Sequence, residues 1–509
     1  MTLLVPLLLG FLASLIGGLY LLGVFRQRRP GEPPLDKGPI PWLGHVFEYR
    51  RHPIKFLQRM KQKHGEVFTI QLVGMYITCL VDPLSLAAFV KESQEKLDFN
   101  KFAQDLAERI FGLKIPKDEK PSREPHKHLR GEGLEVLTQA TMCNLRNVML
   151  QNIGSSSDKK TWLEDKLFMF SYKTIFSASY LSLFGNASCK SEGSLEKAKE
   201  KDLAESDALF SMFRKYDRLF PKLAYGLLLP WDKMEMERIK AFLWNALSIR
   251  KIKAKDNISR LVLDMQQVHQ ELGTKESMLE RHMFVLLWTS QANVGPSAFW
   301  LLFFLMKHPE AMAAVKEEVN LVLKESDQDV AHGGHLIDVT YDMLMKTPIL
   351  DSAIEETLRL IMASLLFRAV LQDTTLKTAD GCEYYMRKGD SMVAFPYIAV
   401  HIDPEIHPDP HSFKYDRFLN PDGSKKTNFY KAGQKMKYYS LPWGAGLTMC
   451  PGRFFATNEL KQFIFLMMVY FDFELKNPNE KIPDADINRL GFGVIHPNQD
   501  IQFRYRPRF

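Results

Sequence analysis

Residues 443–453 read Trp443-Gly444-Ala445-Gly446-Leu447-Thr448-Met449-Cys450-Pro451-Gly452-Arg453, and this stretch decides the fold. Its glycines carry no Cβ, so the backbone can lie close against a flat cofactor. Cys450 comes just before an apolar run, FFATNELKQFIFLMMVYF, which is predicted to form a helix. Backbone N–H groups at a helix start favour a thiolate and lower the thiol pKa. A cysteine taken alone is more often a small buried apolar residue, but the glycine-rich approach and the helix favour a metal-binding thiolate.

Two further motifs precede this loop. Glu356-Thr-Leu-Arg359 places a carboxylate and a guanidinium on one face of a predicted helix, at i and i+3. Phe413-Lys-Tyr-Asp-Arg417-Phe418 follows it in the chain. A lone Glu-x-x-Arg is more simply a surface ion pair, so its meaning depends on its position before Cys450.

Together the three motifs resemble those of the cytochrome P-450 superfamily. The family pattern around its cysteine is Phe-x-x-Gly-x-Arg-x-Cys-x-Gly, and Trp443, Gly446, Cys450 and Gly452 stand in register with it. Trp443 replaces the phenylalanine, and Thr448 replaces an arginine that usually contacts a haem propionate. The resemblance implies haem b, with Cys450 as the axial thiolate ligand of the iron. A thiolate in that position favours O–O bond cleavage.

The resemblance also implies roles for the earlier motifs. Glu356, Arg359 and Arg417 would form a buried structural network, and Arg368 would bind the second propionate. These roles are expectations carried over from the family, residue by residue.

A long, mostly apolar segment, 281–306, has polar residues at its centre: Ser290, Gln291, Asn293 and Ser297. A membrane span rarely places Gln, Asn and Pro together at mid-depth, so a central helix crossing a large core is the better interpretation. Residues 292–297 align with the family segment Ala/Gly-Gly-x-Asp/Glu-Thr, but Gly295 and Pro296 replace the acid and the threonine. A kink is still expected there. Water held by Asn293 or Ser297 would then have to relay protons.

The predicted fold class is mainly α with small β-sheets, in a single large haem domain behind an N-terminal transmembrane helix. Helical periodicity is clear at 53–64, 141–151, 309–324 and 350–360, and strands are predicted at 67–72, 75–81, 391–395 and 501–505. The expected division is a membrane anchor at 1–25, a basic, proline-rich linker at 26–41 and a catalytic domain at 42–509. Residues 3–25 hold no charge and three arginines follow, which predicts a single-pass anchor with the rest in the cytosol.

Composition narrows the function classes. A net charge of +7 over 509 residues is too mild to indicate nucleic-acid binding. Five widely spaced cysteines with no CxxC pair argue against a cysteine-based zinc site and suit a reducing compartment. The stretch FPKLAYGLLLPW, 220–231, is either a buried loop or a loop that dips into the bilayer.

Within the superfamily the chain resembles a branch that holds sterol hydroxylases and a prostanoid endoperoxide isomerase. The first implies 12α-hydroxylation of a sterol in bile-acid synthesis, with O₂ and NADPH electrons delivered by a cytochrome reductase in the endoplasmic reticulum membrane. The second needs neither electrons nor O₂, and the missing acid–threonine pair suits it. A 7α-hydroxylase-like enzyme is a third possibility. The expected substrate-binding residues are Trp288, Ala292, Ser364, Leu365, Leu366 and Phe492, with Asn293 and Ser297 as catalytic residues.

Overall fold

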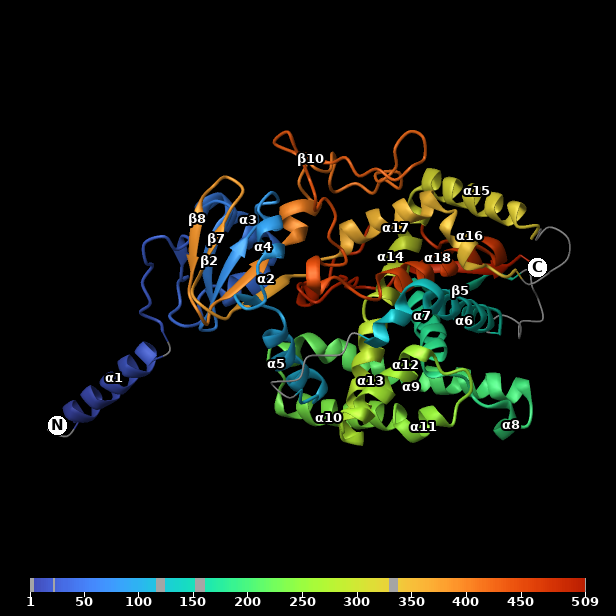
Figure 1. The fold of residues 1–509 in the computed structure, drawn as a ribbon, viewed down its shortest axis with the longest axis horizontal. Helices are drawn as coiled ribbons and strands as arrows, with labels where there is room; N and C mark the ends of the chain where they lie inside the picture. The colour runs from blue at the N-terminus through green and yellow to red at the C-terminus, as the bar shows by residue number, and fades with distance from the viewer. Residues whose placement is uncertain (1–3, 22, 116–123, 152–160, 329–336, 509) are drawn as a thin grey trace.

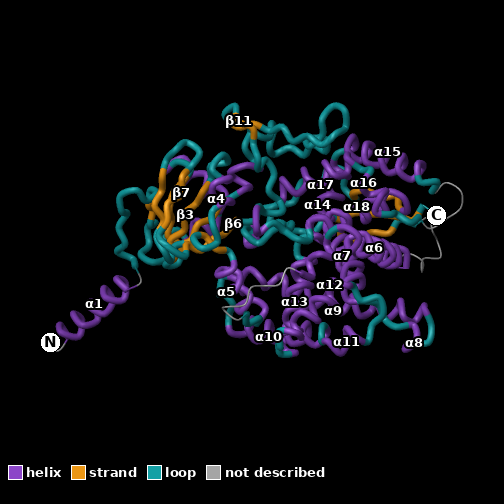
Figure 2. Tube along the Cα trace, in the orientation of Figure 1, coloured by secondary structure: helices purple, strands orange, loops and turns teal. Residues whose placement is uncertain are grey.

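The computed structural model describes the chain except residues 1–3, 22, 116–123, 152–160, 329–336 and 509. Helices make up most of the described residues, and the strands form four small sheets (Figures 1 and 2). The predicted class, mainly α with small β-sheets, is therefore confirmed.

The largest sheet brings together strands from two distant parts of the chain, residues 35–98 and 366–394. Its order is β1-β2-β3-β9-β6-β4, in which β9 runs parallel to β3 and antiparallel to β6. The predicted strands at 67–72, 75–81 and 391–395 are confirmed as three of its members. Pairing with β9 fixes β6 beside the loop that carries Cys450. The strands are β1 (Leu35–Asp36), β2 (Val67–Leu72), β3 (Met75–Leu80), β4 (Leu97–Asp98), β6 (Leu366–Val370) and β9 (Ser391–Ala394).

Three smaller sheets complete the strands of the described residues. One has the order β12-β13-β5, and two are antiparallel pairs, β7–β8 and β10–β11. Their bounds are β5 (Leu163–Lys166), β7 (Thr374–Lys377), β8 (Glu383–Met386), β10 (Tyr430–Lys431), β11 (Gln434–Lys435), β12 (Phe471–Leu475) and β13 (Gln502–Pro507).

Four helices form the centre of the core: α6 (Gly131–Gln151), α7 (Leu167–Phe184), α14 (Val294–Lys307) and α18 (Arg453–Tyr470). Every residue of α14 from Val294 to Leu305 is buried, and α7 and α18 are buried over most of their length. A helix that is apolar all round has no solvent face, so burial inside the core is its stable position. This accounts for the second half of the apolar segment 281–306 as a central core helix. The first half belongs to a separate helix, α13 (Glu276–Gln291), which is only partly buried.

The remaining helices surround this core. Four of them begin with proline at the first helical position, where the missing N–H costs nothing. The predictions at 53–64, 309–324 and 350–360 are confirmed to within two residues. The helices are α2 (Val46–Arg51), α3 (Pro53–His64), α4 (Leu86–Lys91), α5 (Asn100–Phe111), α8 (Cys189–Glu192), α9 (Leu195–Ala224), α10 (Pro230–Ala246), α11 (Ile249–Lys253), α12 (Arg260–Glu271), α13 (Glu276–Gln291), α15 (Pro309–Glu325), α16 (Tyr341–Met345) and α17 (Pro348–Ile361).

The N-terminal helix α1 (Leu4–Leu21) projects from the body on the side of the large sheet (Figure 1). Among the described helices, none is by itself long and apolar enough to cross a membrane; only the pair 276–307 and 309–325, bent by 110°, meets the length and composition required. The segment expected as a linker lies against the body. Arg26 donates two hydrogen bonds to Asp390, and Glu32 pairs with Arg387.

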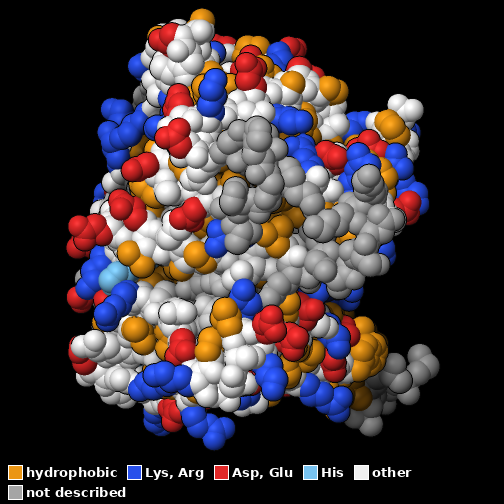
Figure 3. Space-filling view, turned by 90° about the vertical axis from the view of Figure 1, so that its right-hand side faces the viewer, with side chains coloured by type: hydrophobic (Ala, Val, Ile, Leu, Met, Phe, Trp, Pro, Cys, Tyr) orange, Lys and Arg blue, Asp and Glu red, His pale blue; other side chains and the backbone are white. Residues whose placement is uncertain are grey.

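The end of the molecule far from α1 carries a mixed surface. Lys and Arg side chains are interspersed there with Asp and Glu, without a broad area of one sign among the described residues (Figure 3).

Candidate haem-thiolate site at the cysteine loop

The loop before α18 holds Cys450 in a closed turn. The N–H of Cys450 donates to the carbonyl of Trp443 at 2.8 Å, which joins the two ends of the glycine-rich stretch. Gly446 has a φ of +61°, and a Cβ there would come within 2.8 Å of Val90. Glycine is thus required at this position by both conformation and space. Helix α18 begins at Arg453, three residues later than a start at Cys450 itself would give.

Opposing influences act on the Cys450 thiol. Burial raises its pKa, while backbone N–H groups of Gly452 and Arg453 and the Arg453 charge lower it, and the net direction is upward. The helix start alone therefore leaves the thiol protonated. A metal ion that takes the proton's place supplies the missing positive charge, because a coordinating thiol is deprotonated outright.

A buried arginine stands beside this loop. Arg368 on β6 is 7% exposed and donates from Nη2 to Oγ1 of Thr448 at 2.8 Å, while Nη1 donates to the Phe367 carbonyl. Burial lowers its pKa, and none of the ion pairs among the described residues involves it. A buried guanidinium that forms no ion pair among the described residues fits an acidic group of a bound cofactor. The residues present therefore fit haem: a thiol, a glycine cradle and a cation for a propionate.

The Glu356 carboxylate lies at the centre of a buried network. It accepts from Arg359 at 2.7 and 2.9 Å and from Nε of Arg417 at 2.9 and 2.8 Å. The two arginines also donate to the carbonyls of His401 and Pro408. This network ties α17 to the loop segment that leads into residues 443–453.

The central helix breaks where the sequence departs from the family pattern. Helix α13 ends at Gln291, and α14 starts at Val294 with Asn293 as its N-cap residue. The Asn293 Oδ1 accepts from the Val494 N–H at 3.0 Å, and the Ser297 hydroxyl donates to the Asn293 carbonyl at 2.8 Å. The hydroxyl proton of Ser297 is thus used within the helix. Asn293 still has its amide N–H₂ as a donor.

The absence of an acid at position 295 has a packing reason. A Cβ on Gly295 would lie only 2.0 Å from Cδ2 of Tyr172, a fully buried residue of α7. Any side chain at 295 would displace this ring. Tyr172 was not singled out from the sequence, because its contact with Gly295 joins helices 123 positions apart.

An aromatic wall forms around Trp288 on α13. Its ring stacks on Phe220 at 4.5 Å and meets Phe111 edge-on, while Phe220 and Tyr225 both pack on Phe492. The sequence predicted Trp288 and Phe492 but missed the other three.

The structure buries one part of the stretch 220–231 and exposes another. Phe220 is buried at the end of α9, whereas Leu227, Leu229 and Trp231 are 49%, 47% and 66% exposed. The stretch is thus buried at its start and exposed around the turn into α10.

The other predicted substrate residues lie on two adjoining segments. Residues 362–364 bridge to the C-terminal turn 491–494, and Leu365 is 3.0 Å from a Cβ built on Gly491. Leu366 is 3.8 Å from a Cβ built on Gly444, beside the cysteine loop, and Ala292 is fully buried at the helix break. The same C-terminal turn holds Asn293 through Val494. The structure therefore links the helix break, the start of β6 and the C-terminal turn, with β6 continuing to the cysteine loop.

A cysteine loop with a glycine cradle, a buried Glu–Arg–Arg network and a broken central helix define a haem-thiolate protein. The chain belongs to the cytochrome P450 family, whose family model matches residues 33–503. It is 45% identical over 507 residues to the 5-beta-cholestane-3-alpha,7-alpha-diol 12-alpha-hydroxylase of Sus scrofa, covering 99% of this chain and 98% of that one. It is also 45% identical to the human 7-alpha-hydroxycholest-4-en-3-one 12-alpha-hydroxylase, covering 98% of both chains.

A third relative is an enzyme of the second kind considered from the sequence, a prostanoid isomerase. Human prostacyclin synthase is 43% identical over 486 residues, covering 94% of this chain and 95% of that one. The solved structure of retinoic acid-bound cyanobacterial CYP120A1 superposes with a TM-score of 0.67 over 94% of this chain and all of that one, at 19% identity, which shows the fold. The chain is thus a haem-thiolate oxidoreductase of the P450 fold, and haem with thiolate ligation is its cofactor.

Proposed function

We propose that this protein is a sterol 12α-hydroxylase that acts on 7α-hydroxycholest-4-en-3-one in bile-acid synthesis. The observation that carries the proposal is 45% identity over nearly the whole chain to two enzymes named for 12α-hydroxylation of sterols. One atom of O₂ enters the sterol and the other leaves as water, with two electrons from NADPH through a reductase. Endoperoxide isomerisation is the second candidate, favoured by Gly295 and Pro296 at the helix break.

In this proposal Cys450 is the iron ligand, with Trp443, Gly446 and Gly452 forming the loop against the haem face. Haem with a thiolate ligand supplies the activation of O₂. Arg368, held in place by Thr448, binds a propionate. Glu356, Arg359 and Arg417 keep the loop in register and take no part in the chemistry.

The substrate pocket is proposed to lie between the helix break and the C-terminal turn. Trp288 and Phe492 would offer flat apolar surfaces for steroid rings, and the small side chain of Ala292 would leave room for the substrate at the helix break. Ser364, Leu365 and Leu366 line the opposite side. Apolar walls with few polar groups suit a sterol, because burial of its ring system is the main source of binding energy. The free amide N–H₂ of Asn293 holds a water for proton transfer, with Ser297 as a further acceptor.

The chain is proposed to sit in the endoplasmic reticulum membrane through residues 1–25, with 26–41 docked against the body and the catalytic domain 42–509 in the cytosol. Exposed Leu227, Leu229 and Trp231 provide a second apolar contact with lipid. An NADPH–cytochrome reductase is the proposed electron donor. Five lysines precede the cysteine loop, and two of them already pair, Lys425 with Glu355 and Lys431 with Asp403. Of the other three, Lys426, Lys435 and Lys437, the last two are exposed and are proposed to meet an acidic surface.

Turnover by the membrane-reconstituted enzyme tests the proposal. 7α-Hydroxycholest-4-en-3-one and a prostaglandin endoperoxide are offered separately, each with and without NADPH and reductase, and products are identified by mass spectrometry. We expect the sterol to gain one oxygen only when electrons are supplied. Rearrangement of the endoperoxide without electrons, and no change in the sterol, would replace the hydroxylase with the isomerase.

The cofactor assignment has its own test. Cys450→Ala is expected to abolish the haem-thiolate carbon monoxide difference spectrum, whereas Cys382→Ala, at an exposed thiol, leaves it intact. An unchanged spectrum in the Cys450 variant would remove that residue as the ligand.

A further inference from the structure

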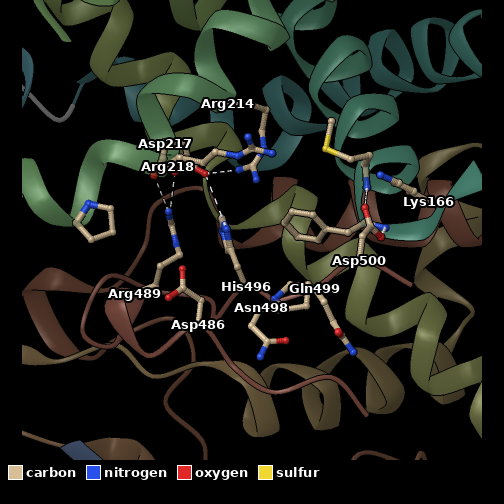
Figure 4. Close-up of a pocket in the computed structure, with 14 residues that line it drawn as sticks. Lys166, Arg214, Asp217, Arg218, Asp486, Arg489, His496, Asn498, Gln499 and Asp500 are labelled. Carbon is tan, nitrogen blue, oxygen red and sulfur yellow. Dashed lines mark hydrogen bonds and ion pairs between the residues drawn. The ribbon is translucent and has the colours of Figure 1, made fainter. Parts of the chain in front are cut away.

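A second polar site lies in a cleft on the other side of Tyr172 from the central helix. Its floor consists of four side chains that are at most 8% exposed: Arg214 and Asp217 from α9, and Arg489 and His496 from the C-terminal segment. Figure 4 shows them converging from these two parts of the chain. None of these residues belongs to the haem-thiolate site described above.

The floor holds more positive than negative charge. Arg214 donates to Oδ2 of Asp217, and Arg489 lies 3.0 Å from Oδ1 and donates to the Asp217 carbonyl at 3.0 Å. Two guanidinium groups thus share one carboxylate. Burial, and then the charges of Arg489 and Arg214, hold the pKa of His496 well below its usual value, so the imidazole stays neutral. One positive charge is left without a counterion.

The other charged groups around the cleft do not supply that counterion. Asp500 accepts the backbone N–H groups of Phe168 and Met169 at the start of α7, and Asp486 accepts from Asn488. Across the whole lining, four cationic side chains face three carboxylates; they are Lys166, Arg214, Arg218 and Arg489 against Asp217, Asp486 and Asp500. The Nε–H groups of Arg214 and Arg489 are buried and have no hydrogen-bond partner among the described atoms.

The cleft has room for a ligand. Its volume is about 530 Å³, within the range of small-molecule sites. Exposed Lys166 and Arg218 stand at its edge, and Phe168, Met169, Pro221 and Pro497 give it apolar walls. A charged entrance therefore leads to a charged floor between apolar surfaces.

We propose that this cleft binds a small organic anion, a carboxylate or sulfonate carried on a compact apolar body. An uncompensated buried charge is costly, so an anion that neutralises it gains more than it loses on leaving water. Guanidinium groups present planar donors that match the two oxygens of a carboxylate. The apolar walls take the rest of the ligand.

The cleft adjoins the helix break through Tyr172. The Arg214 guanidinium lies 4.8 Å from the centre of that ring, and the same ring packs on Gly295. The cleft therefore adjoins the helix break, although none of its lining residues is among those predicted to bind haem or substrate.

Calorimetric titration of the full-length holoenzyme in detergent tests the inference. Cyclohexanecarboxylate is the probe, and cyclohexanecarboxamide, of similar shape but uncharged, is the control. Imidazole at saturating concentration keeps ligands off the haem iron throughout. We expect the carboxylate to bind at least about tenfold more tightly than the amide, with an affinity that falls as salt rises.

Charge reversal at the edge of the cleft locates the site. Arg218→Glu is expected to weaken carboxylate binding at least about tenfold, and because Arg218 is exposed the fold should be retained. Lys215→Glu makes the same charge change at an exposed residue of α9 that does not line the cleft, and should leave the affinity unchanged. Equal binding of the amide, no binding of the carboxylate, or equal loss in both variants would overturn the proposal.

Discussion

Replacing Glu356 with alanine should destabilise the protein severely. Glu356 is fully buried and accepts four hydrogen bonds from Arg359 and Arg417, and a fifth from the Lys414 N–H at 3.0 Å. Its loss leaves two guanidinium groups buried without an anion. Removing one partner of a buried ion pair costs about 3–5 kcal/mol, and two stranded cations place this variant at the upper end.

The neighbouring residue gives a matched control. Glu355 makes one ion pair, with Lys425 at 2.8 Å, and that lysine is 62% exposed. Pairs of this kind contribute about 0–1 kcal/mol, so Glu355→Ala should be nearly silent.

Thermal loss of the carbon monoxide difference spectrum is the assay, because it reports an intact cysteine loop. The midpoint for Glu356→Ala should fall by roughly 5 °C or more, or the variant should not accumulate as holoenzyme. Similar midpoints for the Glu356 and Glu355 variants would refute the reasoning, since the network would then contribute no more than a surface pair.

Three further predictions follow from single contacts. Burial raises the pKa of Glu459 to about 8, so the folded state keeps a proton that the unfolded state loses above about pH 4.5. The free energy of unfolding should therefore fall as pH rises from 4.5 to 8. Glu459→Gln should flatten that pH dependence in denaturant titrations. Gly295→Ala should cost about 1–3 kcal/mol by displacing the Tyr172 ring; an unchanged unfolding midpoint would contradict the contact. Asn293→Leu leaves the Val494 N–H without an acceptor and should cost about 1–3 kcal/mol, whereas Asn293→Asp, which keeps one, should cost less in the same assay.

Local chemistry explains why much of the fold could be predicted from sequence. Pro53 and Pro309 mark helix starts because proline costs nothing at the first helical position. The helix predicted from Leu350 begins two residues earlier, also at a proline, Pro348. The cysteine loop was recognisable because its glycines and cysteine lie within eleven residues. Because the α14 segment is apolar on every side, its sequence excluded a helix with one face in solvent.

Contacts between distant segments could not be predicted in the same way. Thr448 was identified only as a missing arginine, yet it accepts a hydrogen bond from Arg368, 80 positions earlier. Phe220 belonged to a stretch flagged for its apolar character, but its contact with Trp288 depends on how α9 packs across α13. The buried charges around Asp217 carry no local motif at all.

The most direct test of the central claim is turnover of 7α-hydroxycholest-4-en-3-one under ¹⁸O₂ with NADPH and reductase, followed by mass spectrometry and NMR of the product. A sterol hydroxylase of this kind places one ¹⁸O atom at C12 in the α configuration. Label at another carbon would contradict the assigned regiochemistry, and an unlabelled, unchanged sterol would contradict the hydroxylase itself.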